Sequence, residues 1–213
     1  MNAFEPYQAF AAALGYLLGS VPFGLVLTRL AGLGDIREIG SGNIGATNVL
    51  RTGNKFLAFL TLLCDSGKGA AAAVLAAYIW NPEAGLIAGF MAVFGHNFPV
   101  WLKFKGGKGF ATTLGVLLFT AWPVCIGACA TWLLTAGVFR YSSLAALVAL
   151  AAAPAYAYWM DLQAVALMAG GLAMLGFFRH HENIARLIKG EESKIGGKKS
   201  EPAETDQNSG ETP

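Results

Sequence analysis

Long runs of apolar residues, separated by short polar segments, dominate the sequence. A run of about 20 apolar residues is long enough to cross the hydrocarbon core of a bilayer as a helix. The runs are continuous and rich in Ala and Leu, whereas the strands of a transmembrane β-barrel would alternate apolar and polar residues. The pattern therefore predicts an all-α protein, a polytopic membrane helical bundle. The apolar runs lie at residues 7–28, 55–80, 84–101, 110–121, 124–139, 144–159 and 162–178.

The stretch from Phe110 to Phe139 decides the number of spans. As one helix it would be about 45 Å long, which exceeds a hydrocarbon core of about 30 Å. Trp122-Pro123 interrupts the stretch, so we predict two antiparallel segments here and seven transmembrane segments in all. A six-span alternative, with 110–139 as a single helix, would place Arg140 on the side opposite the other basic loops.

The distribution of charge supports seven spans and sets their orientation. Of the 15 Lys and Arg, all except Lys68 fall in segments on one side of the predicted bundle. The opposite side receives only the acids Glu5, Glu83 and Asp161. Because short cytoplasmic loops carry the excess of Lys and Arg, we expect the N-terminus outside and the C-terminus in the cytoplasm.

Composition divides the chain into a membrane domain and a polar tail. Only 13% of the residues are charged, about half the usual fraction of a soluble domain. We assign residues 1–190 to one integral membrane domain. Residues 191–213 lack aromatic residues and are rich in acids and lysines, so we predict a disordered cytoplasmic tail. Three cysteines without metal-ligand spacing and three histidines give no ligand set, so we expect no metal and no cofactor.

Asp65 and Lys68 are the charges that interrupt the second apolar run. At a spacing of three residues, they share one face of a helix and can form an ion pair. Two interpretations stay open: the pair marks a late membrane entry point, or it faces the interior of the bundle, where charged residues of membrane helices usually lie.

Four polar segments lie on the predicted cytoplasmic side, and we expect them to converge into one site. They are residues 35–51, 96–109, 140–143 and 179–192. The first contains Gly40, Gly42 and Gly45, which allow the backbone to approach a ligand closely. It also carries the neutral polar residues Ser41, Asn43, Thr47 and Asn48, followed by Arg51, whose planar guanidinium suits phosphate or carboxylate. The plain alternative is a loop that only connects two helices.

The second segment contains three lysines and three glycines between Lys103 and Gly109. Backbone N–H groups and ammonium charges at the start of a helix favour phosphate binding. The spacing does not match a Walker A loop, because Leu102 stands where the first glycine would be and Gly109 follows Lys108. A basic patch that attracts anionic lipid is the simpler alternative.

Together these segments resemble the three motifs of a bacterial membrane family, the acyl-phosphate:glycerol-3-phosphate acyltransferases. The resemblance is carried by Gly40-Ser41-Gly42-Asn43 through Thr47-Asn48 to Arg51, by His96-Asn97 with Pro99 and Phe104-Lys105-Gly106-Gly107-Lys108-Gly109, and by His180 with Asn183-Ile184 and Arg186-Leu187 to Gly190. Ser143 matches the serine of a further short loop of the family, and His181 stands where an arginine is common.

The resemblance implies that the protein transfers an acyl group from acyl phosphate to the 1-hydroxyl of glycerol 3-phosphate, giving lysophosphatidic acid and phosphate. It also implies a multi-pass protein of the bacterial cytoplasmic (inner) membrane whose site faces the cytoplasm. The expected partners are acyl phosphate, glycerol 3-phosphate and the lipid bilayer, with no nucleic acid, and a monomer is expected to suffice. Acyl phosphate is an activated donor, so the enzyme needs positioning, charge neutralisation and removal of one proton rather than a nucleophile of its own.

The resemblance also assigns site residues. The predicted catalytic residues are Ser41, Arg51, Lys108, Ser143, His180 and Asn183. The predicted substrate-binding residues are Gly40, Gly42, Asn43, Thr47, Asn48, His96, Asn97, Lys105, Gly106, Gly107, Gly109 and Arg186. Arg51 and Lys108 are expected to hold phosphates. Either His180 or a substrate phosphate oxygen is expected to accept the hydroxyl proton.

Other function classes remain as alternatives. A transporter of a small phosphorylated anion would also need membrane spans and cationic loops, but it predicts an internal repeat and polar groups near the midplane. A structural membrane protein with a lipid-binding rim leaves the loop from Gly40 to Arg51 unexplained. An acyl-enzyme at Ser41 is unnecessary but open. The His-x4-Asp pattern of other acyltransferases is absent, because Trp101, Ala185 and Arg186 stand where the Asp would be.

Overall fold

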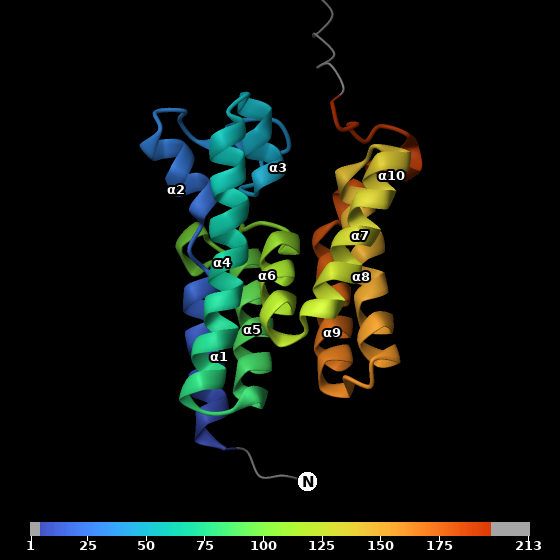
Figure 1. The fold of residues 1–213 in the computed structure, drawn as a ribbon. Helices are drawn as coiled ribbons and strands as arrows, with labels where there is room; N and C mark the ends of the chain where they lie inside the picture. Colours follow the sequence, from blue (N-terminus) through green and yellow to red (C-terminus); the bar gives the residue numbers. More distant parts are fainter. Residues whose placement is uncertain (1–4, 197–213) are drawn as a thin grey trace, which may run out of the picture.

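The computed structural model describes residues 5–196, and this part of the chain is helical (Figure 1). The α-helices are α1 Pro6–Gly19, α2 Phe23–Leu30, α3 Ala46–Val49, α4 Lys55–Ile79, α5 Pro82–Asn97, α6 Phe110–Thr120, α7 Trp122–Phe139, α8 Ser142–Trp159, α9 Gln163–Arg179 and α10 His181–Lys189. Short 3-10 turns lie at η1 Ile36–Glu38, η2 Leu50–Thr52 and η3 Val100–Leu102. The predicted all-α class is confirmed for the described range.

Within residues 5–196, five helical segments are long and apolar enough to cross a membrane. They are Pro6–Leu30, Lys55–Ile79, Pro82–Leu102, Trp122–Phe139 and Ser142–Trp159. Two shorter apolar helices, Phe110–Thr120 and Gln163–Arg179, complete the bundle. Each of the seven predicted apolar runs therefore coincides with a helical segment.

The break predicted at Trp122-Pro123 is confirmed. Helix α6 ends at Thr120, and α7 begins at Trp122 with proline in its first turn, where the missing N–H of proline leaves no hydrogen bond unmade. With 11 residues, α6 is about 16 Å long, roughly half the thickness of the hydrocarbon core. It is therefore a half-length helix inside the bundle.

The first apolar run contains a break that its hydropathy did not predict. Helix α1 ends at Gly19 and α2 begins at Phe23, with Pro22 between them. Proline lacks an N–H and disfavours a helical conformation in the residue before it. The carbonyl oxygen of Val21 accepts from Phe23 N–H at 3.1 Å at this break, and its second lone pair can accept from elsewhere in the bundle.

Small residues allow α1 and α5 to pack closely. On α1 the contact surface carries Ala11, Gly15 and Gly19, and on α5 it carries Ala84, Ala88 and Ala92, each set at intervals of four residues. A Cβ at Gly15 or Gly19 would clash with the backbone of α5. Close backbone approach at small residues is the usual way in which membrane helices associate.

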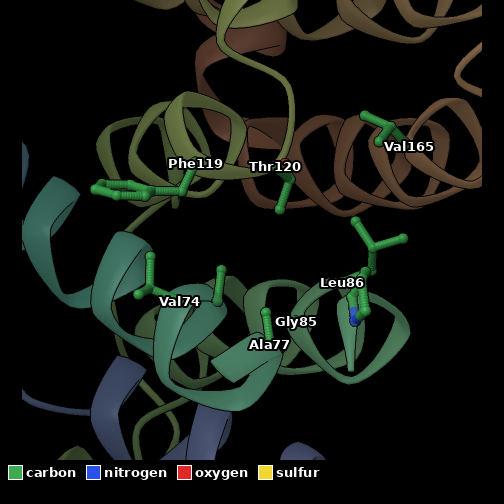
Figure 2. A pocket seen from close by; sticks show the side chains of 9 residues that line it. Val74, Ala77, Gly85, Leu86, Phe119, Thr120 and Val165 are labelled. Carbon is green, nitrogen blue, oxygen red and sulfur yellow. The ribbon is translucent and has the colours of Figure 1, made fainter. Parts of the chain in front are cut away.

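The helices form two groups that are joined through α6 and through the packing of α5 against α9 (Figure 1). One group contains α1, α4, α5 and α6, and the other contains α7, α8 and α9. Where α6 ends, an apolar cavity of about 330 Å³ lies between α4, α5, α6 and α9. Figure 2 shows its lining side chains, among them Val74, Leu86, Phe119 and Val165, which carry no charge.

Asp65 and Lys68 face the interior of the bundle. Lys68 Nζ lies 2.7 Å from Asp65 Oδ1, and both side chains are almost completely buried, at 3% and 2% exposure respectively. This position supports the second of the two interpretations left open by the sequence.

Candidate active site

The four polar segments meet at one end of the bundle, near α3 and α10 in Figure 1. Arg51 Nη2 donates to Ser193 Oγ at 2.8 Å, so the first segment touches the residues that follow α10. Lys108 Nζ donates to Asn183 Oδ1, which joins the second segment to α10. Ser143 Oγ donates to Glu192 Oε1 at 2.6 Å, which adds the first turn of α8. The expected convergence is therefore present.

The first segment is a tight loop held together by Asn48. The buried amide of Asn48 donates to the backbone oxygens of Ile36, Ile39 and Asn43, at distances from 2.8 to 3.0 Å. Its Oδ1 also accepts from the N–H of Ser41 at 3.1 Å. These bonds use the polar atoms of Asn48 inside the loop, so this side chain shapes the loop rather than offering a free binding group.

The glycines of this loop are required by its geometry. Gly40 and Gly42 have positive φ angles, +59° and +67°, which favour glycine. A Cβ at Gly40 would lie 2.5 Å from Asn48 Oδ1 and 2.7 Å from the Arg51 side chain. Ser41 and Thr47 are exposed, and Asn43 Oδ1 accepts from the N–H of Gly45 at 3.0 Å. Gly40 therefore allows Arg51 to lie across the loop.

The glycine-rich second segment is fixed by hydrogen bonds on both sides. Gly106 N–H donates to Asn97 O at 3.2 Å, and Gly107 N–H donates to His96 O at 3.0 Å. Arg179, at the end of α9, donates to the carbonyl oxygens of Gly106 and Gly107, at 3.0 and 3.1 Å. The amides of these two glycines are therefore already bonded and are not free to bind phosphate.

The free donors of this segment lie slightly further along the chain. Gly109, at φ +81°, is the N-cap of α6, and the first N–H groups of a helix have no partner within it. They carry a partial positive charge, which suits an anion. Lys105 is exposed at the surface of the loop, whereas Lys108 points inward to Asn183.

His96 and Asn97 support the glycine-rich segment from below. Both are buried at the end of α5, beneath the glycine-rich segment. A Cβ at Gly107 would clash with the ring of His96. The structure thus places His96 and Asn97 as supports under this segment.

The carboxylate of Glu192, the last residue of the fourth polar segment, accepts hydrogen bonds from both the third and the fourth segments. Asn183 Nδ2 donates to its Oε1 at 2.6 Å, and Arg186 Nε donates to its Oε2 at 2.7 Å. Ser143 donates to the same carboxylate. Burial raises the pKa of Glu192, but these hydrogen bonds outweigh burial and leave the pKa below its usual value. The residues predicted to bind substrate oxygens therefore hold an anionic group in this structure.

His180 is neutral at neutral pH. Its ring is buried, and its Nδ1 lies 2.7 Å from the carbonyl oxygen of Gly176. Burial lowers the pKa of His180 to about 4, with the nearby charge of Lys108 acting in the same direction. A carbonyl only accepts hydrogen bonds, so Nδ1 carries the proton, which leaves the Nε2 lone pair available as an acceptor.

Burial also lowers the pKa of Lys108, to about 8, and the nearby charge of Arg186 contributes to the shift. This lysine thus lies close to other cations and is partly shielded from water. A bound phosphate would stabilise its charged form.

A cavity of about 200 Å³ lies between the first polar segment and the end of the fourth. Its lining consists of Gly40, Ser41, Arg51, Arg186, Glu191 and Ser193. Two guanidinium groups from segments far apart in sequence thus border one small hollow, which is the arrangement expected of a site for a phosphorylated molecule.

Three contact residues were not predicted from the sequence. Arg179 holds the glycine-rich segment, while Glu192 and Ser193 lie against the cations. The acid pair Glu191-Glu192 directly after a basic helix was a signal for an ion pair. The predicted tail begins at residue 191, and its residues 197–213 lie outside the described range. Among the described residues, no group of three His, Cys, Asp or Glu side chains has the arrangement of a metal site.

The fold and the site together define a class: a helical membrane protein with a cluster of cationic side chains at one end of its bundle. The model of the family described as "Glycerol-3-phosphate acyltransferase" matches residues 9–190. The chain belongs to this glycerol-3-phosphate acyltransferase family, and it is an all-helical integral membrane enzyme that forms lysophosphatidic acid.

Curated relatives and solved structures agree with this assignment. A glycerol-3-phosphate acyltransferase of Paramagnetospirillum magneticum is 65% identical over 92% of this chain and 98% of the relative. One of Rhodospirillum rubrum is 66% identical over 88% of this chain and 91% of the relative.

Two similar solved structures are of PlsY, described as an integral membrane glycerol 3-phosphate acyltransferase. Its glycerol 3-phosphate form has a TM-score of 0.84 at 37% identity, over 89% of this chain and 96% of PlsY. Its lysophosphatidic acid form has a TM-score of 0.80 at 36% identity, over 88% of this chain and 94% of PlsY.

Proposed function

We propose that this enzyme takes its acyl group from acyl phosphate and transfers it to the 1-hydroxyl of glycerol 3-phosphate, as the first step of membrane phospholipid synthesis. The observation that carries this proposal is that Arg51 and Arg186 border one small cavity, to which Lys108 is linked through its hydrogen bond to Asn183. Asn183 and Arg186 both donate to the carboxylate of Glu192, so cations from three separate segments lie in one hydrogen-bonded group. Both proposed substrates carry phosphate, so a site with several cations suits them together. The similar PlsY structures are described as its glycerol 3-phosphate and lysophosphatidic acid forms, which is consistent with this assignment.

The positions of the cations suggest which residues bind which phosphate group. Arg51 and Arg186 border the cavity and are suited to one phosphate. Lys108 and the first turn of α6 are suited to the other, because the N–H groups of Gly106 and Gly107 are already bonded. Ser143 and Asn183, which hold the carboxylate of Glu192, would orient substrate oxygens. In this assignment, the N–H groups of Gly106 and Gly107 do not bind phosphate, because they are bonded to backbone oxygens.

The chemistry needs no nucleophile from the protein. The hydroxyl oxygen of glycerol 3-phosphate attacks the carbonyl carbon of acyl phosphate, and the bond from that carbon to the phosphate oxygen breaks. Phosphate leaves with the electron pair, and the hydroxyl proton passes to a base. Cations beside the leaving phosphate stabilise its growing charge.

A substrate phosphate oxygen is the better candidate for the base. His180 has a pKa of about 4, whereas a phosphate monoester has a second pKa of about 6 and is the stronger acceptor. The Nε2 lone pair of His180 can still accept a hydrogen bond from the hydroxyl and orient it. We therefore assign His180 to orientation and the proton to phosphate.

We further propose a topology for the membrane domain of residues 1–190. The two shorter apolar helices, α6 and α9, would complete the five long segments to seven spans, with the N-terminus outside. The basic residues then face the cytoplasm of a bacterial inner membrane, and so does the site. The segments that supply the cations of the site contact one another within a single chain, and we propose that a functional monomer is possible.

The proposed donor is tested by supplying the purified enzyme with acyl phosphate, alone and together with glycerol 3-phosphate. With both substrates, we expect lysophosphatidic acid and phosphate in equal amounts. With acyl phosphate alone, we expect neither a burst of phosphate nor an acyl adduct. A stoichiometric burst with an adduct on Ser41 would instead establish an acyl-enzyme, and no product from either mixture would refute the proposed donor.

A further inference from the structure

The buried ion pair of Asp65 and Lys68 has no role in the proposed chemistry. It lies on α4, inside the bundle, with both side chains almost inaccessible. Removing two charges from water is costly, and charged residues inside membrane bundles usually serve a function. Hydrophobic residues of the same volume could fill this space without that cost, so we expect the pair to have a function.

Lys68 connects the pair to the element that precedes the first polar segment. Its Nζ donates to Val21 O at 2.7 Å, at the break before Pro22, and lies 5.7 Å from the ring centroid of Phe23. Helix α2 starts here, and its Gly24 packs so tightly on the backbone of Ile44 that a Cβ would clash. Lys68 thus fixes the start of the helix on which the loop from Gly40 to Arg51 rests.

Asp65 connects the pair to the second polar segment. Its Oδ1 lies 3.6 Å from His96 Nδ1, and both side chains are almost completely buried, so the carboxylate and the imidazole ring face each other inside the bundle. The other side of the His96 ring meets Gly107, and the backbone oxygen of His96 accepts from Gly107 N–H. His96 therefore lies between the carboxylate of Asp65 and the glycine-rich segment.

We propose that Asp65 and Lys68 are positioning residues for the acyl transfer. Through Val21 and His96, the pair sets the placement of residues 40–51 relative to residues 103–109, and each of these segments supplies a cation for one phosphate. This inference rests on the proposed function and extends it to two residues that touch no substrate. Misplacement of binding groups by about 1 Å can reduce an enzymatic rate about 100-fold, so such an anchor has a measurable effect.

The charge swap D65K/K68D separates positioning from simple stabilisation. The swapped pair still forms an ion pair inside the bundle, so a purely structural role would be preserved. Its contacts outside the pair are lost, because an aspartate at position 68 cannot donate to Val21 O and a lysine at position 65 offers no acceptor oxygen to His96 Nδ1. The neutral double variant D65N/K68M leaves no charge unpaired and serves where the swap does not fold.

Thr61→Val is the matched control. Thr61 is also buried on α4, but its hydroxyl donates only to Leu57 O, within the same helix. Valine keeps the shape of the side chain and removes the polar atom. We expect wild-type kinetics from this variant.

Two readouts decide the proposal. In the folded swap or neutral double variant, we expect the KM for glycerol 3-phosphate to rise at least about tenfold with a smaller change in kcat, and amide hydrogen exchange across residues 103–109 to rise while that of α8 is unchanged. Wild-type KM and exchange in a folded double variant would overturn the proposal. If wild-type enzyme shows no activity with acyl phosphate, the proposed donor fails, whereas the exchange measurement still decides whether the pair positions the segment.

Discussion

Three side chains that were expected to meet substrate oxygens surround the carboxylate of Glu192. Ser143, Asn183 and Arg186 all donate to it, at 2.6 to 2.7 Å. Charge-assisted hydrogen bonds of this kind are strong, and they favour an anion at this position. At the scale of single residues, the site is thus a set of donors suited to an anionic substrate, with one acid of the chain already among them.

Arg51 tests the assignment of the cationic residues most simply. It lies at the wall of the cavity, and its guanidinium is held only by Ser193 Oγ and, more distantly, by Asn48 Oδ1. We expect Arg51→Ala to raise the KM for at least one phosphorylated substrate about tenfold or more in steady-state assays. Lys55→Ala, which removes an exposed cation at the start of α4, should leave both KM values unchanged. An unchanged KM for both substrates in Arg51→Ala would contradict the role of Arg51.

Lys108 gives the account a dependence on pH. Its pKa is lowered to about 8, so its charged form predominates below this pH and is lost as the pH rises through it. We expect kcat/KM, which reports on the free enzyme, to fall above about pH 8. Lys108→Arg should shift this fall to higher pH, because arginine stays protonated. If the alkaline limbs of both enzymes coincide, another group controls the fall.

At the scale of elements, hydropathy predicted the membrane segments well, because a bilayer demands continuous apolar helices of a fixed length. The break at Trp122-Pro123 followed from the same constraint. The break at Val21-Pro22 did not, because residues 7–28 are no longer than one span and their length requires no break. The lysine that donates to the carbonyl oxygen of Val21 lies 47 positions further along the chain.

The site shows the same limit. Motif residues such as Arg51 and Asn183 could be predicted because their local pattern matches a family. Arg179 and Ser193 could not, since their partners, the carbonyl of Gly106 and the guanidinium of Arg51, come from segments distant in sequence. Spacing along the chain carries no information on such contacts.

The segment after α10 links several parts of the site. Glu192 and Ser193 bind side chains of the site, and Ile195 N–H donates to Arg140 O at 2.6 Å. We expect a chain truncated after Gly190 to lose at least about nine-tenths of its activity. A chain truncated after Ser200 keeps these contacts and should retain full activity, as predicted for a dispensable tail. Equal activity of the two truncated proteins would show that the contacts of Glu192 and Ser193 are unimportant for turnover.

At the scale of the whole molecule, the polar segments gather at one end of the bundle, opposite the end where α1 begins (Figure 1). Of the 15 Lys and Arg, all except Lys68 belong to the sequence segments 29–55, 103–108, 140 and 179 onward, which are the segments predicted to lie on the side of the site. We therefore expect a reporter that works only in the cytoplasm to be active when it is fused after Pro213, and a reporter that works only in the periplasm to be inactive there. Activity of a periplasmic reporter at this position would reverse the proposed orientation.

The central claim is that one site holds both phosphorylated substrates at the same time, so that the acyl group passes directly between them. The most direct measurement is a set of initial rates over a matrix of acyl phosphate and glycerol 3-phosphate concentrations. Direct transfer predicts intersecting double-reciprocal lines, since both substrates must be bound before either product leaves. Parallel lines, the pattern of a ping-pong reaction, would contradict the account and point to an acylated enzyme.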